Sequence, residues 1–219
     1  MLQEGDIFLD IGANIGYYVL IESKLVGEKG CGYAVEPVME NLAFLKRNLA
    51  INNCNNVKIF QIALGDRNGK TYIYVAESPN LSSITKYSGC KYVRKQEVNM
   101  TTVDDFLADK KFPKLIRMDV EGYEYEIFKG MKKTLSQADS LIIFVELHNF
   151  LLQEEKVEEI LKMLEFNKFK IRFVSTCSNI PENLIVRKLK HYVFSPEIRL
   201  YNISFQLLRK LCKIYPALH

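Results

Sequence analysis

The stretch that decides the fold is Asp10-Ile-Gly-Ala-Asn-Ile-Gly16, which follows directly on the apolar run DIFLD at residues 6–10. The apolar run predicts a buried strand, and the spacing after the second glycine predicts a helix over residues 15–25. The two glycines allow a tight turn and a close approach of the backbone to a ligand. The N-terminus of the helix would present N–H groups, and the carboxylate of Asp10 suits an ammonium group. This pattern predicts a strand–turn–helix unit that binds a small ligand.

Apolar runs and amphipathic segments alternate outward from this unit. Runs typical of strands are found at residues 32–35, 57–63, 115–118 and 141–147, with two later ones at 169–174 and 191–194. Helical spacing of apolar residues is found at 38–49, 127–135 and 154–166. The helix over 15–25 is expected to turn four residues inward, namely Ile15, Tyr18, Val19 and Leu25.

This alternation predicts an α/β fold in which a parallel sheet carries helices on both faces. Such a sheet binds its ligand at the carboxyl ends of its strands. The segment 69–96 interrupts the alternation with one strand-like run, 71–75, and a stretch rich in Ser, Asn and Gly. We expect it to be either a loop near the ligand-binding edge or a hairpin that extends the sheet.

Length and composition limit the class of protein. The chain has 219 residues, 48% hydrophobic and 26% charged, which predicts one globular domain over 1–219. Its 5 cysteines form no CxxC pair, and the first residues do not have the character of a secretion signal. Both features favour a cytoplasmic protein with reduced thiols. The net charge of +4 is too small to predict a nucleic-acid partner.

The positive charge is concentrated near the C-terminus, between Arg187 and Lys213. Within the predicted C-terminal region 168–219, residues 203–215 have the spacing of an amphipathic helix with basic residues away from its apolar face. Such a helix packs on the sheet, packs on another subunit in a homo-oligomer, or binds an anionic membrane surface as a peripheral contact.

Acidic residues follow the second and third predicted strands. Glu36 ends the second strand 24 residues after Gly12, and a carboxylate at this place can accept hydrogen bonds from both ribose hydroxyls. Asp66 follows the third strand, where we expect it to bind an adenine edge, although Gly65-Asp66-Arg67 also has the composition of a turn.

The ends of the fourth and fifth predicted strands carry the candidates for catalysis. Asp119 and Glu121 are two residues apart, which places them on one side of an extended chain. Carboxylates that face a cleft can orient a hydroxyl, remove its proton or hold a metal. His148 follows the fifth strand and is a candidate general base, because its ordinary pKa is about 6.5.

Together these motifs resemble the class I S-adenosylmethionine (SAM) methyltransferases and, within them, the FkbM family. The similarity covers residues 5–150 and depends on several motifs in a fixed order: DIGANIGYY at 10–18, VEP at 35–37, ALGD-x-x-G at 63–69, TTVDDFL at 101–107, MDVEGYE at 118–124 and FVELH at 144–148. The lysine usual before DVEG is replaced here by Arg117, which keeps the charge but changes the donor geometry.

The resemblance implies a Rossmann-like fold with a seven-stranded sheet whose last strand is antiparallel. It also implies SAM as cofactor and O-methylation of a sugar, glycan, glycolipid or small hydroxylated metabolite. The methionine part of SAM would lie on Asp10, Gly12, Asn14 and Gly16, and its ribose on Glu36. Asp119, Glu121 and His148 would act on the acceptor hydroxyl, and a divalent metal at Asp119 is compatible with the sequence but not required by it.

Two other functions stay open. An RNA methyltransferase would account for the basic C-terminal segment, but Asp119-Val-Glu121-Gly122 differs from the Asn/Asp-Pro-Pro-aromatic loop of base N-methylation. A SAM-binding protein without catalysis would bind the cofactor and methylate nothing. The acceptor itself is expected to be selected by residues 78–92 and by the region after Ser175.

Overall fold

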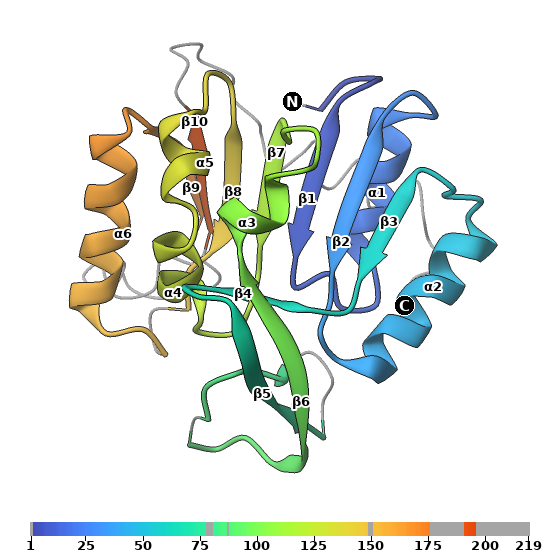
Figure 1. The fold of residues 1–219 in the computed structure, drawn as a ribbon, viewed down its shortest axis with the longest axis vertical. Helices are drawn as coiled ribbons and strands as arrows, with labels where there is room; N and C mark the ends of the chain where they lie inside the picture. The colour runs from blue at the N-terminus through green and yellow to red at the C-terminus, as the bar shows by residue number, and fades with distance from the viewer. Residues whose placement is uncertain (1, 78–80, 87, 149–150, 176–190, 196–219) are drawn as a thin grey trace.

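The computed structural model describes residues 2–77, 81–86, 88–148, 151–175 and 191–195. Seven strands form the main sheet in the order β3-β2-β1-β7-β8-β10-β9 (Figure 1). Their bounds are β1 Ile7–Ile11, β2 Cys31–Val35, β3 Val57–Phe60, β7 Leu115–Met118, β8 Ile142–Glu146, β9 Lys170–Ser175 and β10 His191–Ser195. Neighbours from β3 to β8 are parallel, and β10 is antiparallel to both β8 and β9. The sheet implied by the sequence resemblance is therefore confirmed.

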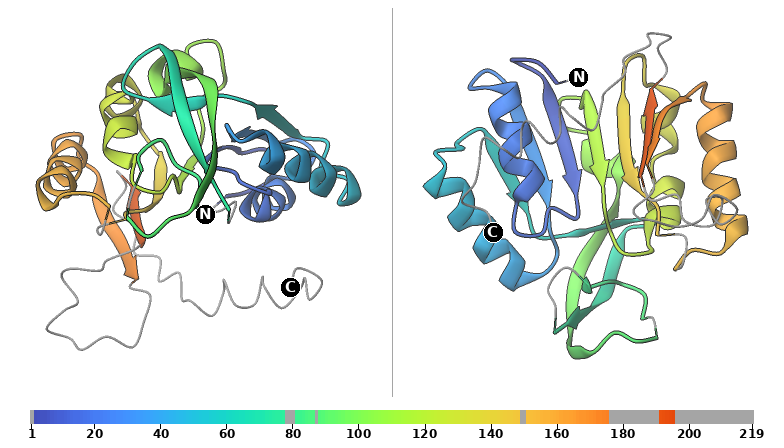
Figure 2. Two further views of the ribbon diagram at one scale, coloured as in Figure 1. Left: turned by 90° about the horizontal axis from the view of Figure 1, so that it is seen from below. Right: turned by 180° about the vertical axis from the view of Figure 1, so that it is seen from behind.

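Helices cover both faces of the sheet, as the alternation predicted (Figure 2). Their bounds are α1 Tyr17–Val26, α2 Met39–Ile51, α3 Val103–Leu107, α4 Glu124–Lys129, α5 Lys132–Ser136 and α6 Glu154–Phe166. The pleat of β1 separates two cores. Phe8 points to α1 and α2, whereas Leu9 and Ile11 point to the helices α3 to α6.

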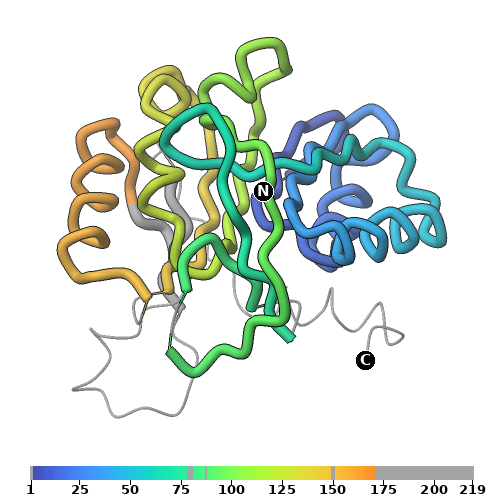
Figure 3. Tube along the Cα trace, turned by 60° about the horizontal axis from the view of Figure 1, so that its bottom comes forward, coloured from blue at the N-terminus to red at the C-terminus, as the bar shows by residue number. Residues whose placement is uncertain are grey.

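A second sheet stands at the edge where the parallel strands end (Figures 1 and 3). It has the order β4-β6-β5, with β4 at Ala63–Gly65, β5 at Gly69–Ala76 and β6 at Tyr92–Thr102. The segment 69–96 is thus mainly a hairpin, but the hairpin belongs to its own sheet and does not extend the main one. The strand predicted over 57–63 is divided in the same way, because β3 ends at Phe60 and Ala63 already pairs with Met100 of β6.

Two helix predictions need correction. Ile15 and Leu25 are 42% and 41% exposed, whereas the buried face of α1 includes Glu22 and Ser23 beside its apolar residues. Ser23 donates a hydrogen bond to Oδ1 of Asn56 (2.6 Å), so a polar side chain occupies a position that the hydrophobic pattern assigned to the surface.

The helix expected around 127–135 is two helices, α4 and α5, with Gly130 between them. A Cβ at Gly130 would lie 1.9 Å from the carbonyl oxygen of Gly65, so the break brings this segment against β4. The apolar residues predicted to face inward are all buried: Ile127, Phe128, Met131 and Leu135.

The expected basic helix at 203–215 and the remainder of the basic segment lie outside the described residues, apart from the strand β10. Among the helices that the structure does describe, none has the length and apolarity needed to cross a membrane.

Candidate functional site

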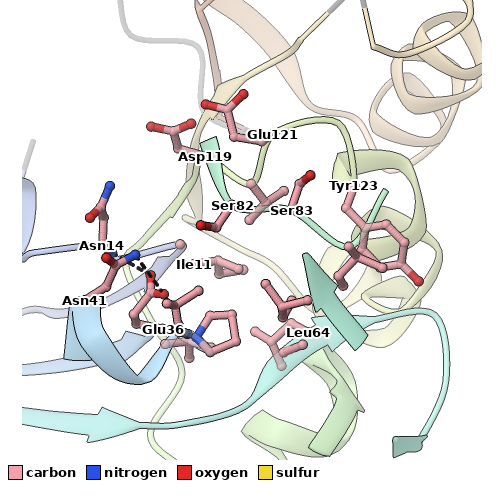
Figure 4. Close-up of a pocket in the computed structure, with 18 of the residues that line it drawn as sticks. Ile11, Asn14, Glu36, Asn41, Leu64, Ser82, Ser83, Asp119, Glu121 and Tyr123 are labelled. Carbon is pink, nitrogen blue, oxygen red and sulfur yellow. Dashed lines mark hydrogen bonds between the residues drawn. The ribbon is translucent and has the colours of Figure 1, made fainter. Parts of the chain in front are cut away.

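A cleft lies at the carboxyl ends of β1, β2 and β7, between the main sheet and the hairpin (Figure 4). Glu36, Asn14 and Asn41 lie at one end of the cleft, and Asp119 and Glu121 lie at the other. Its lining comes from five chain segments: Ile11, Gly12 and Asn14; Val35, Glu36, Pro37, Val38 and Asn41; Ile62, Ala63 and Leu64; Ile73, Ser82, Ser83 and Ile84; and Asp119, Val120, Glu121, Tyr123 and Ile127. Five of the nine residues that the sequence predicted for the site are in this lining, namely Gly12, Asn14, Glu36, Asp119 and Glu121.

The turn after β1 brings the backbone against the opposite loop. Gly12 has φ +83°, and a Cβ there would lie 2.0 Å from the carbonyl oxygen of Asp119. Only glycine fits this combination of a left-handed backbone and close packing. The N–H groups of Gly12 and Ala13 donate to the carbonyl oxygen of Val35 (3.0 Å each). The turn therefore shapes the cleft, and these two N–H groups are already bonded within the protein.

Gly16 has a structural position outside the lining of the cleft. It precedes the first turn of α1 with φ +91°, and a Cβ there would lie 2.4 Å from Cδ1 of Leu45. The second glycine of the motif thus allows α1 to pack against α2, and the structure gives no support to its predicted contact with the cofactor.

Glu36 is buried, and protein groups hold both of its carboxylate oxygens. The backbone N–H of Asn14 donates to Oε2 (2.8 Å), while the N–H of Val38 (2.8 Å) and the amide of Asn41 (3.3 Å) donate to Oε1. Burial raises the pKa of Glu36 to about 7, although these hydrogen bonds act in the opposite direction. Further donors from a ligand would stabilise the ionised form. The Glu36 carboxylate is therefore held in a position to accept hydrogen bonds from the hydroxyl groups of a ligand.

Asp10 lies beneath the cleft and not in its lining. The pleat of β1 turns Asp10 toward α1, where it is fully buried. Its Oδ1 accepts a hydrogen bond from Nη1 of Arg117 (3.0 Å), and Nη2 of the same arginine donates to Oδ2 of Asp119 (3.0 Å). The ring of Tyr18 lies 3.8 Å from the guanidinium carbon. The predicted contact of Asp10 with the ligand has no support in the structure; Asp10 instead helps Arg117 to position Asp119.

Asp119 and Glu121 approach each other through a turn and not through an extended strand. β7 ends at Met118, and Glu121 and Gly122 have φ values of +53° and +89°. A positive φ is uncommon for a residue with a side chain and is found preferentially where function demands it. The predicted side-by-side placement is right, but its expected cause, the alternation of a strand, is wrong.

His148 meets both carboxylates from the loop after β8. Its Nε2 lies 3.4 Å from Oε2 of Glu121 and 3.8 Å from Oδ1 of Asp119. On the other side of the ring, Nδ1 lies 2.6 Å from Oε1 of Glu124, a carboxylate with no exposed surface. The three predicted catalytic residues are therefore together, and Glu124 fixes the orientation of the imidazole.

The electrostatics of this group argue against His148 as a free general base. Burial lowers the pKa of His148, but the hydrogen bonds and charges of Glu121 and Glu124 outweigh burial and raise it to about 10. Burial also raises the pKa of Asp119, against the effect of Arg117. A histidine that already carries a proton cannot accept another, so the two carboxylates are the better candidates for proton removal.

Asp66 is the third predicted ligand-binding residue, after Gly16 and Asp10, that lies outside the lining of the cleft. It forms ion pairs with Lys129 and Arg67 (3.1 Å each). Partial burial raises the pKa of Asp66 less than these two cations lower it. The segment after β3 does line the cleft, as expected, but through its apolar residues Ile62 and Leu64.

Sequence reasoning missed several residues of the site. Asn41 lies in the first turn of α2 and had no motif around it, and Glu124, the first residue of α4, was not singled out for the site. Ser82 and Ser83 lie in the predicted specificity segment 78–92, and the structure places both in the lining. An isolated β-bridge between Ser83 and Tyr74 holds this segment on the edge of the hairpin.

The comparisons with known proteins agree with this geometry. The methyltransferase FkbM domain matches residues 10–171. A protein-L-isoaspartate O-methyltransferase of Archaeoglobus fulgidus is 34% identical over 58 residues, which are 26% of this chain and 27% of that protein.

Solved structures share the fold at low sequence identity. The FkbM methyltransferase of Methylobacillus flagellatus superposes with a TM-score of 0.61 at 15% identity and covers 89% of this chain and 44% of its own. Fibrillarin of Aeropyrum pernix, solved with bound SAM, gives a TM-score of 0.52 at 11% identity over 88% of this chain and 67% of its own. This chain thus spans less than half the length of the Methylobacillus protein. With the domain match over most of the described residues, the chain belongs to the FkbM methyltransferase family.

Proposed function

We propose that the protein is a SAM-dependent methyltransferase that methylates a hydroxyl group of a sugar, a glycolipid or a small metabolite. The observation that carries the proposal is the arrangement of the cleft. A buried carboxylate suited to ribose, Glu36, lies at one end, and the carboxylate pair Asp119 and Glu121 lies at the other.

The residues of the cleft fit the chemical parts of SAM. Glu36 would accept hydrogen bonds from the two ribose hydroxyls, since both of its oxygens are fixed and its ionised form gains from further donors. The apolar side chains of Ile62, Leu64 and Ile73 suit an adenine ring. The turn at Gly12 lets the backbone approach the methionine part closely. When bound, SAM supplies a methyl group on a positively charged sulfur, which is a good leaving group.

In methyl transfer, the residues of this chain would align the acceptor hydroxyl and remove its proton. Asp119 and Glu121 are half-buried, so an acceptor hydroxyl could donate a hydrogen bond to one of them. Arg117 fixes the Oδ2 atom of Asp119 and leaves Oδ1 toward the cleft side of the carboxylate. A carboxylate held in this way can orient the hydroxyl and accept its proton as the oxygen attacks.

A methyl-transfer assay tests the proposal. The purified protein is incubated with SAM and a panel of hydroxylated acceptors, among them sugars and glycolipids, and products are detected by the added mass of one methyl group. We expect at least one acceptor to be methylated on oxygen. Asp119→Asn should lower kcat by about 10²–10⁴-fold and keep SAM binding, because proton removal is lost while the ribose site is intact.

Three results would contradict the proposal in different ways. SAM binding with no methylated acceptor would favour a protein that binds SAM without catalysis. Methylation of an amine or of RNA in place of a hydroxyl would keep the cofactor but overturn the acceptor class. Equal rates in the wild type and Asp119→Asn would remove the carboxylate from the reaction.

A further inference from the structure

Three side chains with metal-ligating atoms converge at the acceptor end of the cleft. We propose that Asp119, Glu121 and His148 bind a divalent first-row transition-metal cation, Mn²⁺ or Zn²⁺, that activates the acceptor hydroxyl. The role of the cation in activating a hydroxyl rests on the proposed function. The existence of the metal site rests only on the positions of the three side chains. One oxygen of each carboxylate and one nitrogen of His148 all lie within 4.8 Å of one another.

The separations between these atoms match those of ligands around one ion. At bond lengths of about 2.1 Å, two ligands at a right angle are about 3.0 Å apart, and two at the tetrahedral angle are about 3.4 Å apart. Nε2 of His148 is 3.4 Å from Oε2 of Glu121 and 3.8 Å from Oδ1 of Asp119. These two separations would need to change by only a few tenths of an ångström, and the carboxylate oxygens of Asp119 and Glu121, which lie within 4.8 Å of one another, would close around the ion.

Two of the three ligands, Asp119 and His148, are each held by a partner on the far side. Nη2 of Arg117 donates a hydrogen bond to Oδ2 of Asp119, so Oδ1 is the oxygen that faces the imidazole. Oε1 of Glu124 lies 2.6 Å from Nδ1 of His148. This contact leaves Nε2 as the nitrogen directed at the carboxylates of Asp119 and Glu121. A buried carboxylate behind a ligating histidine is the usual support of a metal-binding imidazole.

The position of the carboxylates also favours a cation. Glu121 has a left-handed backbone with φ +53°, and this conformation turns its side chain toward Asp119 and His148. Both carboxylates line the cleft, so an ion bound here would be open to a ligand in it. In the free protein Arg117 and the imidazole of His148 offset the charge of these carboxylates, and a divalent cation bound to Nε2 would take the place of the imidazole proton there.

The mixed ligand set selects the kind of metal. Imidazole nitrogen suits Zn²⁺ and its neighbours in the first transition row, while carboxylate oxygens suit Mn²⁺ and Mg²⁺. One nitrogen and two oxygens therefore favour Mn²⁺ or Zn²⁺ over Mg²⁺ and Ca²⁺. Three protein ligands leave positions for an acceptor oxygen, as in catalytic metal sites.

Methyl transfer at this site needs no reactant besides SAM and the acceptor. The acceptor oxygen forms a bond to the methyl carbon, the bond from that carbon to sulfur breaks, and its electron pair stays on sulfur as a neutral thioether. The cation acts as a Lewis acid that lowers the pKa of the hydroxyl, and the hydroxyl proton passes to a carboxylate or to water.

Metal binding is measured on the full chain after treatment with EDTA, by Mn²⁺ electron paramagnetic resonance and by calorimetric titration with Zn²⁺. We expect one Mn²⁺ to bind, Mg²⁺ to bind at least tenfold more weakly, and Glu121→Gln to weaken Mn²⁺ binding by more than about tenfold. Glu124→Gln, which changes a residue that supports His148 and accepts a hydrogen bond from the N–H of Gly122 but binds no metal itself, should weaken it by about 10–100-fold. The control Glu97→Gln alters an exposed carboxylate of the hairpin and should leave Mn²⁺ binding unchanged.

The same preparations separate this inference from the proposed function. Glu36→Gln is expected to lose SAM affinity and keep Mn²⁺, whereas Glu121→Gln is expected to lose Mn²⁺ and keep SAM within a few-fold. A wild type that binds SAM but neither Mn²⁺ nor Zn²⁺ at millimolar concentration would overturn the metal site alone. Equal Mn²⁺ affinity in the wild type and Glu121→Gln would also overturn it. A wild type that binds neither SAM nor either metal would overturn both.

Discussion

Replacement of Glu36 by glutamine should nearly abolish SAM binding while leaving the fold intact. The glutamine has the same size but replaces one carboxylate oxygen with an amino group. In the free protein both oxygens already accept hydrogen bonds, from the N–H groups of Asn14 and Val38 and from Asn41, so the new amino group must face a donor. A hydrogen bond to a charged group contributes about 1.5–3 kcal/mol, and one such bond to ribose is lost while the other loses its charge. We therefore expect a loss of about 2–4 kcal/mol, or roughly 30- to 1,000-fold in Kd.

Isothermal titration calorimetry with SAM measures this loss. The matched control is Glu22→Gln in α1, because Glu22 is also buried but does not line the cleft. We expect the control to bind SAM within about threefold of the wild type, and circular dichroism to give the same spectrum for all three proteins. A change of less than threefold in Glu36→Gln would refute the assignment of Glu36 to the ribose.

Three further predictions come from the structure, and a fourth comes from the sequence of residues 203–215. Because burial raises the pKa of Glu36 to about 7 and ribose hydroxyls favour its ionised form, the Kd for SAM should rise up to tenfold per unit as the pH falls below about 7, stay level above about 8, and lose this dependence in Glu36→Gln. Gly12→Ala should lower the free energy of unfolding in urea by at least about 2 kcal/mol, against about 1 kcal/mol for Gly5→Ala, since both have a positive φ but only the first would place a Cβ 2.0 Å from a carbonyl oxygen. Arg117→Lys should cost about 2–4 kcal/mol of unfolding free energy in the same assay, because a lysine ammonium lacks the planar fork by which Nη1 and Nη2 each reach a different carboxylate; an unchanged midpoint would argue against the positioning role. Deletion of residues 203–219 should abolish co-sedimentation with anionic liposomes, and equal sedimentation of both forms would exclude a membrane role for this segment.

The sequence was sufficient for the main sheet because its strands are short, apolar and separated by helices. β7 and α6 have the predicted bounds, 115–118 and 154–166. The alternation pattern failed where polar residues are buried. Glu22 and Ser23 occupy the inner face of α1 because Asn56 and the Asp10–Arg117 pair lie opposite, and no pattern of hydrophobicity can foresee such partners.

The site was predictable to the extent that strand ends define it. Glu36, Asp119 and His148 were found by their positions after β2, β7 and β8. Asp10 and Asp66 were assigned to the ligand for the same reason, but each is held by a cation from another part of the chain, Arg117 and Lys129. Long-range ion pairs depend on the packing of the whole fold and leave no signal in the local sequence.

A crystal structure of the protein with S-adenosylhomocysteine, the product that remains after methyl transfer, would show directly whether the cleft binds SAM. We expect the two ribose hydroxyls within hydrogen-bond distance of Glu36, and the sulfur at the end of the cleft that holds Asp119 and Glu121. A product bound elsewhere, or in the cleft with its ribose away from Glu36, would contradict the assignment of this cleft to SAM.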